Sequence, residues 1–294
     1  MLGASTCTVS INQGDRLNSG IVSDDDDYER SGVIVGLVGP RMNKNCVMES
    51  QELRVTEEQN TRENRYGGRR RGEATVLNLF AEFYNIDHLP NYTELQNSDS
   101  TQTSLTKMFK KSHSKKLLRD YKEITGFINT PAFLNIPAYN QRNRIIFEML
   151  LAEANHRAGS VDKRAYVHVV GLGLGVWKIY KDQNILFVTE FMETVSRMKP
   201  DQVSDVDFSW ITLPDDADLG VGDGDLVPGT NIRIHLSKRN PWDKLQGDDR
   251  GKLVVASWAW DGMSFVGNEY WAGSLSSSSD PAAACCTQVT ILIL

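Results

Sequence analysis

Short runs of consecutive apolar residues recur along the chain and predict the strands of a buried sheet. The run at residues 165–170 is typical of a parallel strand that is covered on both faces, and it makes His168 a candidate core histidine rather than a ligand. Residues 231–236 instead alternate apolar and polar positions, as a half-buried strand does. The expected strands are residues 32–38, 165–170, 206–211, 231–236 and 253–258.

Apolar positions spaced three and four residues apart predict the helices. The clearest pattern is at residues 139–158, where Ile145, Met149 and Ala152 recur at helical spacing and Gly159 supplies a stop. Residues 75–84, 105–124 and 185–195 are the other expected helices, the second of them with a basic face. Strands that alternate with helices predict an α/β fold, a sandwich of helices around a mixed central sheet.

Composition divides the chain into a tail and one domain. Residues 1–30 are polar and end in a run of aspartates, which favours an acidic, disordered N-terminal tail. The remaining residues, 31–294, are expected to form a single domain, because a chain that is 40% hydrophobic can bury a full core over this length.

A polar segment at residues 51–72 has two interpretations. It is either a mobile loop over a ligand, with its arginines facing phosphates, or a flexible surface loop. The arginines beside Tyr66, Gly67 and Gly68 are Arg62, Arg65, Arg69, Arg70 and Arg71.

Charge and cysteine usage narrow the class of protein. The net charge of −6 argues against a nucleic-acid partner, and the chain has no apolar run long enough to span a membrane. The cysteines show no paired CxxC spacing, so we expect neither a metal site nor a disulfide framework. We therefore expect a reduced, intracellular protein of the cytoplasm.

A glycine-rich loop directly follows the run at residues 165–170. Gly171, Gly173 and Gly175 leave little side chain between the backbone and a ligand, so successive N–H groups can approach a phosphate closely. The same glycines also suit a tight crossing of two backbones. Because the spacing is GxGxG and Val176 follows, the dinucleotide fingerprint GxGxxG is not met.

Three carboxylates form a second candidate site near the C-terminal end of the sequence. Asp261 follows the strand expected at residues 253–258, Glu269 lies in a loop, and Asp280 precedes a proline at an expected helix start. Asp261 has a simpler explanation as a turn residue and Asp280 as a helix cap. Their density favours a site, because strand ends and helix starts share one crevice in α/β folds.

The segments AYVHVVGLGLGVWK, YNQRNRIIFEMLLAEAN and AWDGMSFVGNEYW resemble the macrodomain-type ADP-ribosyl hydrolases of the MavL effector family, which are related in fold to poly(ADP-ribose) glycohydrolase. The resemblance implies a macrodomain-like α/β/α sandwich that binds ADP-ribose without a metal or another cofactor. It implies Asp261, Asp280 and Glu269 as catalytic residues. The implied ligand-binding residues are Gly171, Leu172, Gly173, Leu174, Gly175, Val176, Trp177, Gly262, Gly267 and Asn268.

The function implied by the resemblance is hydrolysis of ADP-ribose from a protein side chain, arginine-linked, with ADP-ribosylated ubiquitin as the substrate of the characterised branch. The paired glutamates of the glycohydrolase signature are absent from this sequence. A non-catalytic ADP-ribose reader is the main alternative. A nicotinamide-dependent oxidoreductase is disfavoured, since Asp205 and Asp207 lie too far beyond Gly175 for the acidic residue expected about twenty residues on.

Overall fold

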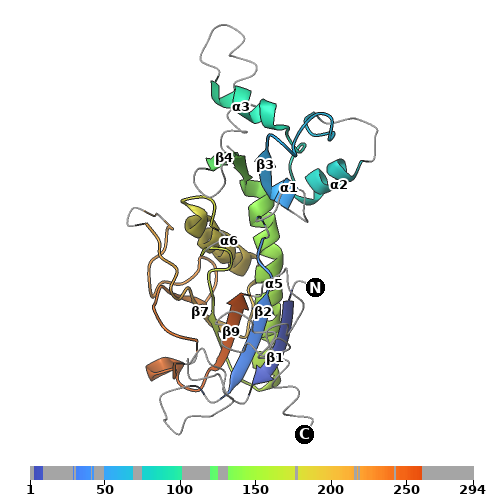
Figure 1. Cartoon of the computed structure of the whole chain (residues 1–294). Coiled ribbons are helices and arrows are strands. Elements are labelled where there is room, and N and C mark those ends of the chain that lie inside the picture. Colours follow the sequence, from blue (N-terminus) through green and yellow to red (C-terminus); the bar gives the residue numbers. More distant parts are fainter. Residues whose placement is uncertain are drawn as a thin grey trace, which may run out of the picture. The chain divides into compact units, whose positions relative to one another are not determined.

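The computed structural model describes residues 3–8, 29, 31–40, 42, 50–68, 75–100, 120–124, 132–175, 178–214, 217, 219–241 and 243–259. The chain divides into two compact units (Figure 1). The first unit draws on Met1–Gly39, Asn143–Gly175 and Asn184–Leu294, and the second on Pro40–Arg142 and Val176–Gln183. The expectation of a single domain over residues 31–294 stays a prediction.

A six-stranded sheet organises the first unit, in the order β1-β2-β9-β6-β7-β8. The edge strand β1 runs antiparallel to β2, and the other neighbours are all parallel, so the sheet is mixed as predicted. The strands are β1 (Gly3–Thr8), β2 (Gly32–Leu37), β6 (Ala165–His168), β7 (Val203–Asp207), β8 (Arg233–His235) and β9 (Leu253–Ala259).

The core of the first unit lies between one face of this sheet and two helices, α5 (Ile136–Ser160) and α6 (Gln183–Met198). Phe191 of α6 is fully buried, and its ring centroid lies 4.7 Å from that of Phe147 and 5.3 Å from that of Phe208. Aromatic contacts thus join the two helices to the end of β7, and they add to the free energy of burying apolar surface.

The second unit has its own three-stranded antiparallel sheet, in the order β3-β5-β4. Its core includes Tyr92, Tyr121 and Phe133. Its elements are α1 (Ser50–Leu53), β3 (Arg54–Thr56), α2 (Val76–Phe83), α3 (Tyr92–Ser100), β4 (Tyr121–Ile124) and β5 (Ala132–Asn135). No helix among the described residues is long and apolar enough to cross a membrane.

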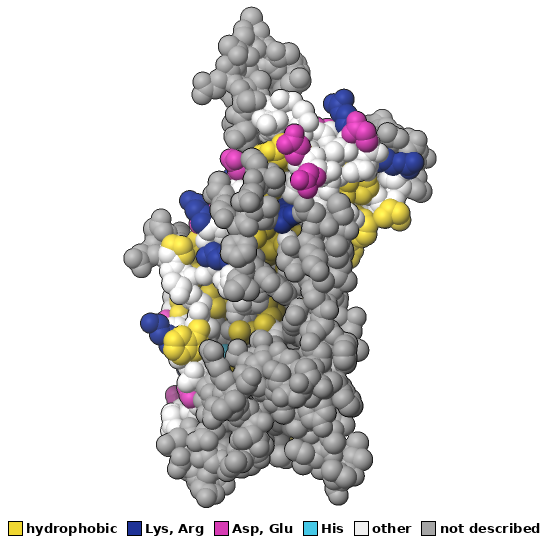
Figure 2. Space-filling view, in the orientation of Figure 1, with side chains coloured by type: hydrophobic (Ala, Val, Ile, Leu, Met, Phe, Trp, Pro, Cys, Tyr) yellow, Lys and Arg dark blue, Asp and Glu magenta, His cyan; other side chains and the backbone are white. Residues whose placement is uncertain are grey.

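Helix α2 shows how a local signal sets an element of this second unit. Thr75 caps the helix, because its hydroxyl accepts a hydrogen bond of 3.2 Å from the Asn78 amide. One face of the helix is apolar and exposed (Figure 2), with Val76, Leu79 and Phe83 retaining 64%, 60% and 47% of their accessible surface.

Most of the elements predicted from the sequence are present. The strands expected at residues 32–38, 165–170, 231–236 and 253–258 correspond to β2, β6, β8 and β9. The helices expected at residues 75–84, 139–158 and 185–195 correspond to α2, α5 and α6. The predicted α/β class is therefore confirmed.

Two predictions about polar segments are wrong in part. Gly3–Thr8, assigned to the disordered tail, forms β1, because pairing with β2 satisfies its backbone groups. The segment at residues 51–72 begins with α1 and β3 rather than a loop, since the buried Leu53 and Val55 anchor it. The rest of the predicted tail, from residue 9 to residue 28, lies outside the described residues.

Two other elements differ in position or type. The strand expected at residues 206–211 is instead Val203–Asp207, because the charge of Asp205 has partners that the sequence pattern does not reveal. The last four residues of the helix expected at residues 105–124, Tyr121–Ile124, form β4, because they pair with β5. The part at residues 105–119 lies outside the described residues.

The aromatic contacts of Phe191 predict a large effect of truncation. Phe191→Ala removes a fully buried ring and should lower the free energy of unfolding by about 3–5 kcal/mol, as cavity-forming substitutions of phenylalanine do. Urea denaturation followed by circular dichroism would measure the loss. Val161→Ala is the control, because Val161 is 53% exposed and should change stability by less than about 0.5 kcal/mol. Equal effects of the two substitutions would contradict the description of the core.

Candidate functional site

The carboxyl ends of the parallel strands share one edge of the large sheet, and that edge is the candidate site. Ligands of open α/β sheets bind in this position, because the connecting loops and helix starts meet there. Gly39 follows β2, the glycine loop at residues 169–175 follows β6, and Trp210 and Arg239 follow β7 and β8. β9 ends at the same edge with Ala259, between β2 and β6.

Hydrogen bonds shape the glycine loop from within. The Val170 amide donates to the Ser257 hydroxyl of β9 at 2.9 Å, which ties the start of the loop to the neighbouring strand. The Leu172 amide donates to the Val170 carbonyl at 2.9 Å, and the Leu174 amide donates to the Gly171 carbonyl at 3.1 Å. The Leu172 side chain is buried in the core, so the loop is anchored on its inner side.

The outer side of the loop is open as far as the described residues go. Among them, and apart from the chain neighbours of each glycine, no heavy atom lies within 4 Å of the place that a Cβ would take at Gly173 or at Gly175, and the φ of Gly173 is +74°. Among the described residues, no backbone carbonyl accepts a hydrogen bond from the Gly171 amide or from the Gly175 amide. Such amides can donate to an anion that approaches the open side.

The inner side of the loop packs closely against the end of β2. A Cβ on Gly39 would lie 3.4 Å from the Cβ of Leu172 and 3.8 Å from the Gly173 amide nitrogen. Both interpretations of the glycines therefore have a physical basis. The inner side of the loop has the tight backbone crossing, and the outer side has the amides that a phosphate-binding loop needs. Phosphate binding by the loop stays a prediction.

The face of the sheet that points away from α5 and α6 carries a polar network around Asp207, which the sequence did not reveal. Asp207 is buried at the end of β7, and its carboxylate accepts hydrogen bonds from the hydroxyls of Tyr166 at 3.0 Å and Ser237 at 2.8 Å. Burial and the Asp207 carboxylate together raise the pKa of Tyr166. His168, beside Tyr166 on β6, is buried as predicted, and burial lowers its pKa.

A second buried carboxylate, Asp205, has a histidine and a lysine as hydrogen-bond partners. His235 Nε2 lies 2.9 Å from one carboxylate oxygen, and Lys252 Nζ lies 2.5 Å from the other. Burial alone would raise the pKa of Asp205, but these hydrogen bonds outweigh it and lower the pKa to about 2. The hydrogen bond to Asp205 raises the pKa of His235 in turn.

The same cluster includes a group that resembles a metal site. Within the described part of the chain, ligand atoms of Asp205, His235 and Asp249 lie within 4.8 Å of one another. The Lys252 ammonium also lies 2.5 Å from the Asp249 carboxylate, so it sits between the two carboxylates. Lys252 already supplies the positive charge that a metal ion would contribute, and the cluster is therefore explained as a structural ion-pair network.

Trp210 is a further residue at this edge that sequence reasoning missed. Its side chain is 60% exposed, and its φ is 61°, which is uncommon for a bulky residue. The Trp210 amide donates to the Ser237 carbonyl at 2.9 Å, and Nε1 donates to the Arg239 carbonyl at 3.1 Å. An aromatic face is thus held in a strained conformation beside the strand ends. No local pattern in the sequence could have predicted it, because the strain depends on contacts with the segment after β8.

The predicted site residues fall into two groups. Gly171, Leu172, Gly173, Leu174 and Gly175 lie in the loop at the sheet edge, as expected. The others lie outside the described residues, and their roles stay predictions: Val176, Trp177, Asp261, Gly262, Gly267, Asn268, Glu269 and Asp280.

The backbone of the glycine loop leads to a prediction for a matched pair of variants. Gly173→Ala places a side chain on a residue with a φ of +74° and should cost about 1 kcal/mol of stability. Gly175→Ala meets open space at an ordinary φ and should change stability by less than about 0.5 kcal/mol. Thermal and urea unfolding of both variants would test the difference. Similar losses would show that the loop does not hold this conformation.

The contact between His235 and Asp205 predicts a pH-dependent stability. Because folding raises the pKa of His235, its contribution is complete below the unfolded pKa of about 6.5 and is lost as the pH rises through the folded pKa. Asp205 stays ionised throughout this window, since its pKa is about 2. His235→Gln should therefore cost about 2 kcal/mol near pH 5.5 and progressively less at higher pH. His156→Gln, at an exposed position of α5, is the control for the loss of a histidine side chain, and urea unfolding over this pH range measures both variants.

Comparison with known proteins identifies the family. The sequence model of the MavL-like ADP-ribosylhydrolases matches residues 1–293. Two Drosophila melanogaster proteins, ADP-ribosylarginine hydrolase CG2909 and ADP-ribosylarginine hydrolase CG3568, are each 34% identical to this chain. The alignments cover 99% and 96% of this chain and 56% and 53% of those proteins, so the chain spans about half the length of the curated relatives it matches. The chain belongs to the MavL-like ADP-ribosylhydrolase family.

Proposed function

We propose that this chain removes ADP-ribose from arginine side chains of proteins. The observation that carries the proposal is the family match over residues 1–293, together with two relatives whose names specify ADP-ribosylarginine as the substrate. The matched region covers nearly all of this chain, and in both relatives it covers about half of the protein. The proposal therefore assigns the hydrolase activity to the region that the three proteins share.

The sheet edge supports this proposal. ADP-ribose carries a diphosphate, and the open side of the glycine loop presents backbone amides at the carboxyl end of a central parallel strand. Because Gly173 and Gly175 have no side chains, an anion can come close to the backbone. We propose a macrodomain-type arrangement, related to that of poly(ADP-ribose) glycohydrolase, in which this loop binds the diphosphate.

The chemistry needs carboxylates near the anomeric carbon of the ribose. The bond between this carbon and a guanidinium nitrogen breaks through a transition state with positive charge on the sugar, as in glycoside hydrolysis. A water molecule adds its hydroxyl to the carbon, and its remaining proton passes to the leaving guanidine nitrogen. We assign Asp261 and Asp280 to activation of the water and to stabilisation of the developing charge, with Glu269 close to them. Asp261 follows β9 by two residues, which places it in sequence just beyond this sheet edge.

The carrier protein that we propose is ubiquitin. The basis is the resemblance of the sequence to the characterised branch of the family, whose substrate is ADP-ribosylated ubiquitin. A cytoplasmic location fits this carrier and the absence of paired cysteine spacing in the sequence.

Substitution of the two aspartates tests the proposed chemistry. Asp261→Asn and Asp280→Asn should each lower the rate of ADP-ribose release by about 10²–10⁴-fold and leave ADP-ribose binding intact, because the amide keeps the shape and loses the charge. Release from arginine-ADP-ribosylated ubiquitin is measured by mass spectrometry, and binding by calorimetry. The matched control is Asp201→Asn, an exposed aspartate in the turn before β7. Wild-type rates from both site variants would refute these roles.

A comparison of ADP-ribosylated carrier proteins distinguishes a hydrolase from a non-catalytic ADP-ribose reader. Ubiquitin linked to ADP-ribose through arginine should be cleaved, and proteins linked through serine or glutamate should be cleaved far more slowly. Tight binding of ADP-ribose with no release from any carrier would establish a reader instead. Absence of both binding and release would refute the proposed function.

A further inference from the structure

Three buried polar atoms in the first unit point to a binding site on the second face of the large sheet, the face that carries Tyr166. His168 Nδ1, Arg239 Nη1 and Trp258 Nε1 are buried and have no hydrogen-bond partner within the described part of the chain. Native proteins leave few buried polar groups unpaired, because each one loses its hydrogen bonds to water without a replacement. Three such atoms together indicate a polar partner.

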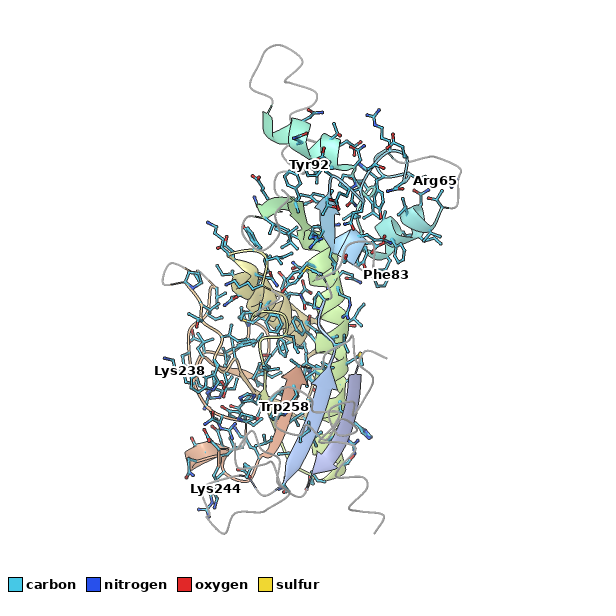
Figure 3. The ribbon with its side chains drawn as sticks, in the orientation of Figure 1. Arg65, Phe83, Tyr92, Lys238, Lys244 and Trp258 are labelled. Carbon is cyan, nitrogen blue, oxygen red and sulfur yellow. The ribbon has the colours of Figure 1, made fainter. Side chains whose placement is uncertain are left out.

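The three side chains lie on the face of the sheet that carries Tyr166. His168 follows Tyr166 on the same face of β6, and it lies opposite Ala256 of β9. Trp258, labelled beside β9 in Figure 3, packs against the cluster that contains Tyr166 and Ala256. The Arg239 guanidinium carbon lies 5.2 Å from the centroid of the Tyr166 ring, and the Arg239 carbonyl lies 3.1 Å from His168 Nε2.

The hydrogen bond to Arg239 fixes the chemistry of His168. A carbonyl oxygen can only accept, so Nε2 carries the proton and donates it. Burial lowers the pKa of His168, which keeps the ring neutral and leaves a lone pair on Nδ1. Arg239 Nη1 and Trp258 Nε1 are donors only. The site therefore offers one acceptor and two donors.

This combination distinguishes between two kinds of ligand. The diphosphate of ADP-ribose has no proton to donate at neutral pH, so its oxygens would face the lone pair of His168 without a hydrogen bond. The buried Asp207 carboxylate, which contributes to the electrostatic environment of His168, would also repel an anion. A hydroxyl group donates and accepts at the same time. Two neighbouring hydroxyls can donate to His168 and accept from Arg239 and Trp258.

We propose that the second face of the sheet binds the vicinal hydroxyls of a ribose through His168, Arg239 and Trp258. The choice of ribose rests on the proposed function, because ADP-ribose contains two such sugars. The adenosine ribose and the terminal ribose present the same chemistry. ADP carries only the first and ribose 5-phosphate only a sugar of the second kind, so these two compounds distinguish the sources.

The indole N–H of Trp258 gives a direct readout. The protein is labelled with ¹⁵N in its tryptophan side chains, and Trp258→Phe assigns the Trp258 signal. Addition of ADP-ribose should shift this signal, and either ADP or ribose 5-phosphate should reproduce the shift. Inorganic phosphate should leave the signal unchanged. A shift with phosphate alone would overturn the choice of a hydroxyl ligand.

Variants test the contribution of each partner to affinity. His168→Phe removes the acceptor, and Trp258→Phe removes one donor while retaining an aromatic ring. Each should raise the Kd for ADP-ribose by about three- to tenfold, the effect of one lost hydrogen bond. His156→Phe at an exposed position of α5 is the control for His168→Phe and should leave the Kd unchanged. If His168→Phe fails to fold, the Trp258 variant and the indole signal still decide the outcome.

The outcomes separate this inference from the proposed function. Binding of ADP-ribose with an unmoved Trp258 signal and unchanged Kd values in the variants would overturn the ribose site and leave the hydrolase proposal intact. No binding of ADP-ribose and no release from any carrier, with a Trp258 shift on addition of ribose 5-phosphate, would support the site and refute the hydrolase. No response to either compound would overturn both.

Discussion

The parallel pairing of β9 between β2 and β6 is the constraint on which the first unit depends. These strands come from distant parts of the chain, and their registers join Val33 to Val255 and Ala165 to Leu253. The pairing completes the hydrogen bonds of both neighbours and brings the carboxyl ends of three strands to one edge. Without β9, the loop after β2 and the glycine loop after β6 would have no common scaffold.

The two faces of this sheet serve different purposes. Val167, Val206 and Val255 point into the apolar core below α5 and α6, whereas Tyr166, Asp205 and Asp207 alternate with them and form polar networks. Successive side chains of a strand point to opposite faces of the sheet, so the position of a residue in the strand decides which face its side chain occupies. Burial of the carboxylates is offset by Lys252, His235 and neighbouring hydroxyls, each of which hydrogen-bonds an ionised oxygen.

The geometry at the carboxyl ends of the strands and the family membership are two independent lines of support for the proposed hydrolase function. The glycine loop has an anchored inner side, where Leu172 is buried and Gly39 packs against it, and an outer side that is open to a ligand. The family membership points to the chemistry of ADP-ribose, and the loop amides are the place that we propose for its diphosphate. Trp210, strained and exposed, adds an aromatic face at the same edge.

Local patterns were enough to predict the α/β class, the long helix α5, the central strands and the position of the glycine loop, because each of these follows from periodicity or from glycine. The sequence did not reveal β1 or the true limits of β7. A polar strand such as Gly3–Thr8 forms only when a neighbour pairs with its backbone, and Asp205 is stable in a strand only beside Lys252 and His235. The tertiary structure alone decided the polar face around Tyr166, since its members come from β6, β7, β8 and β9 and meet only after the sheet has formed.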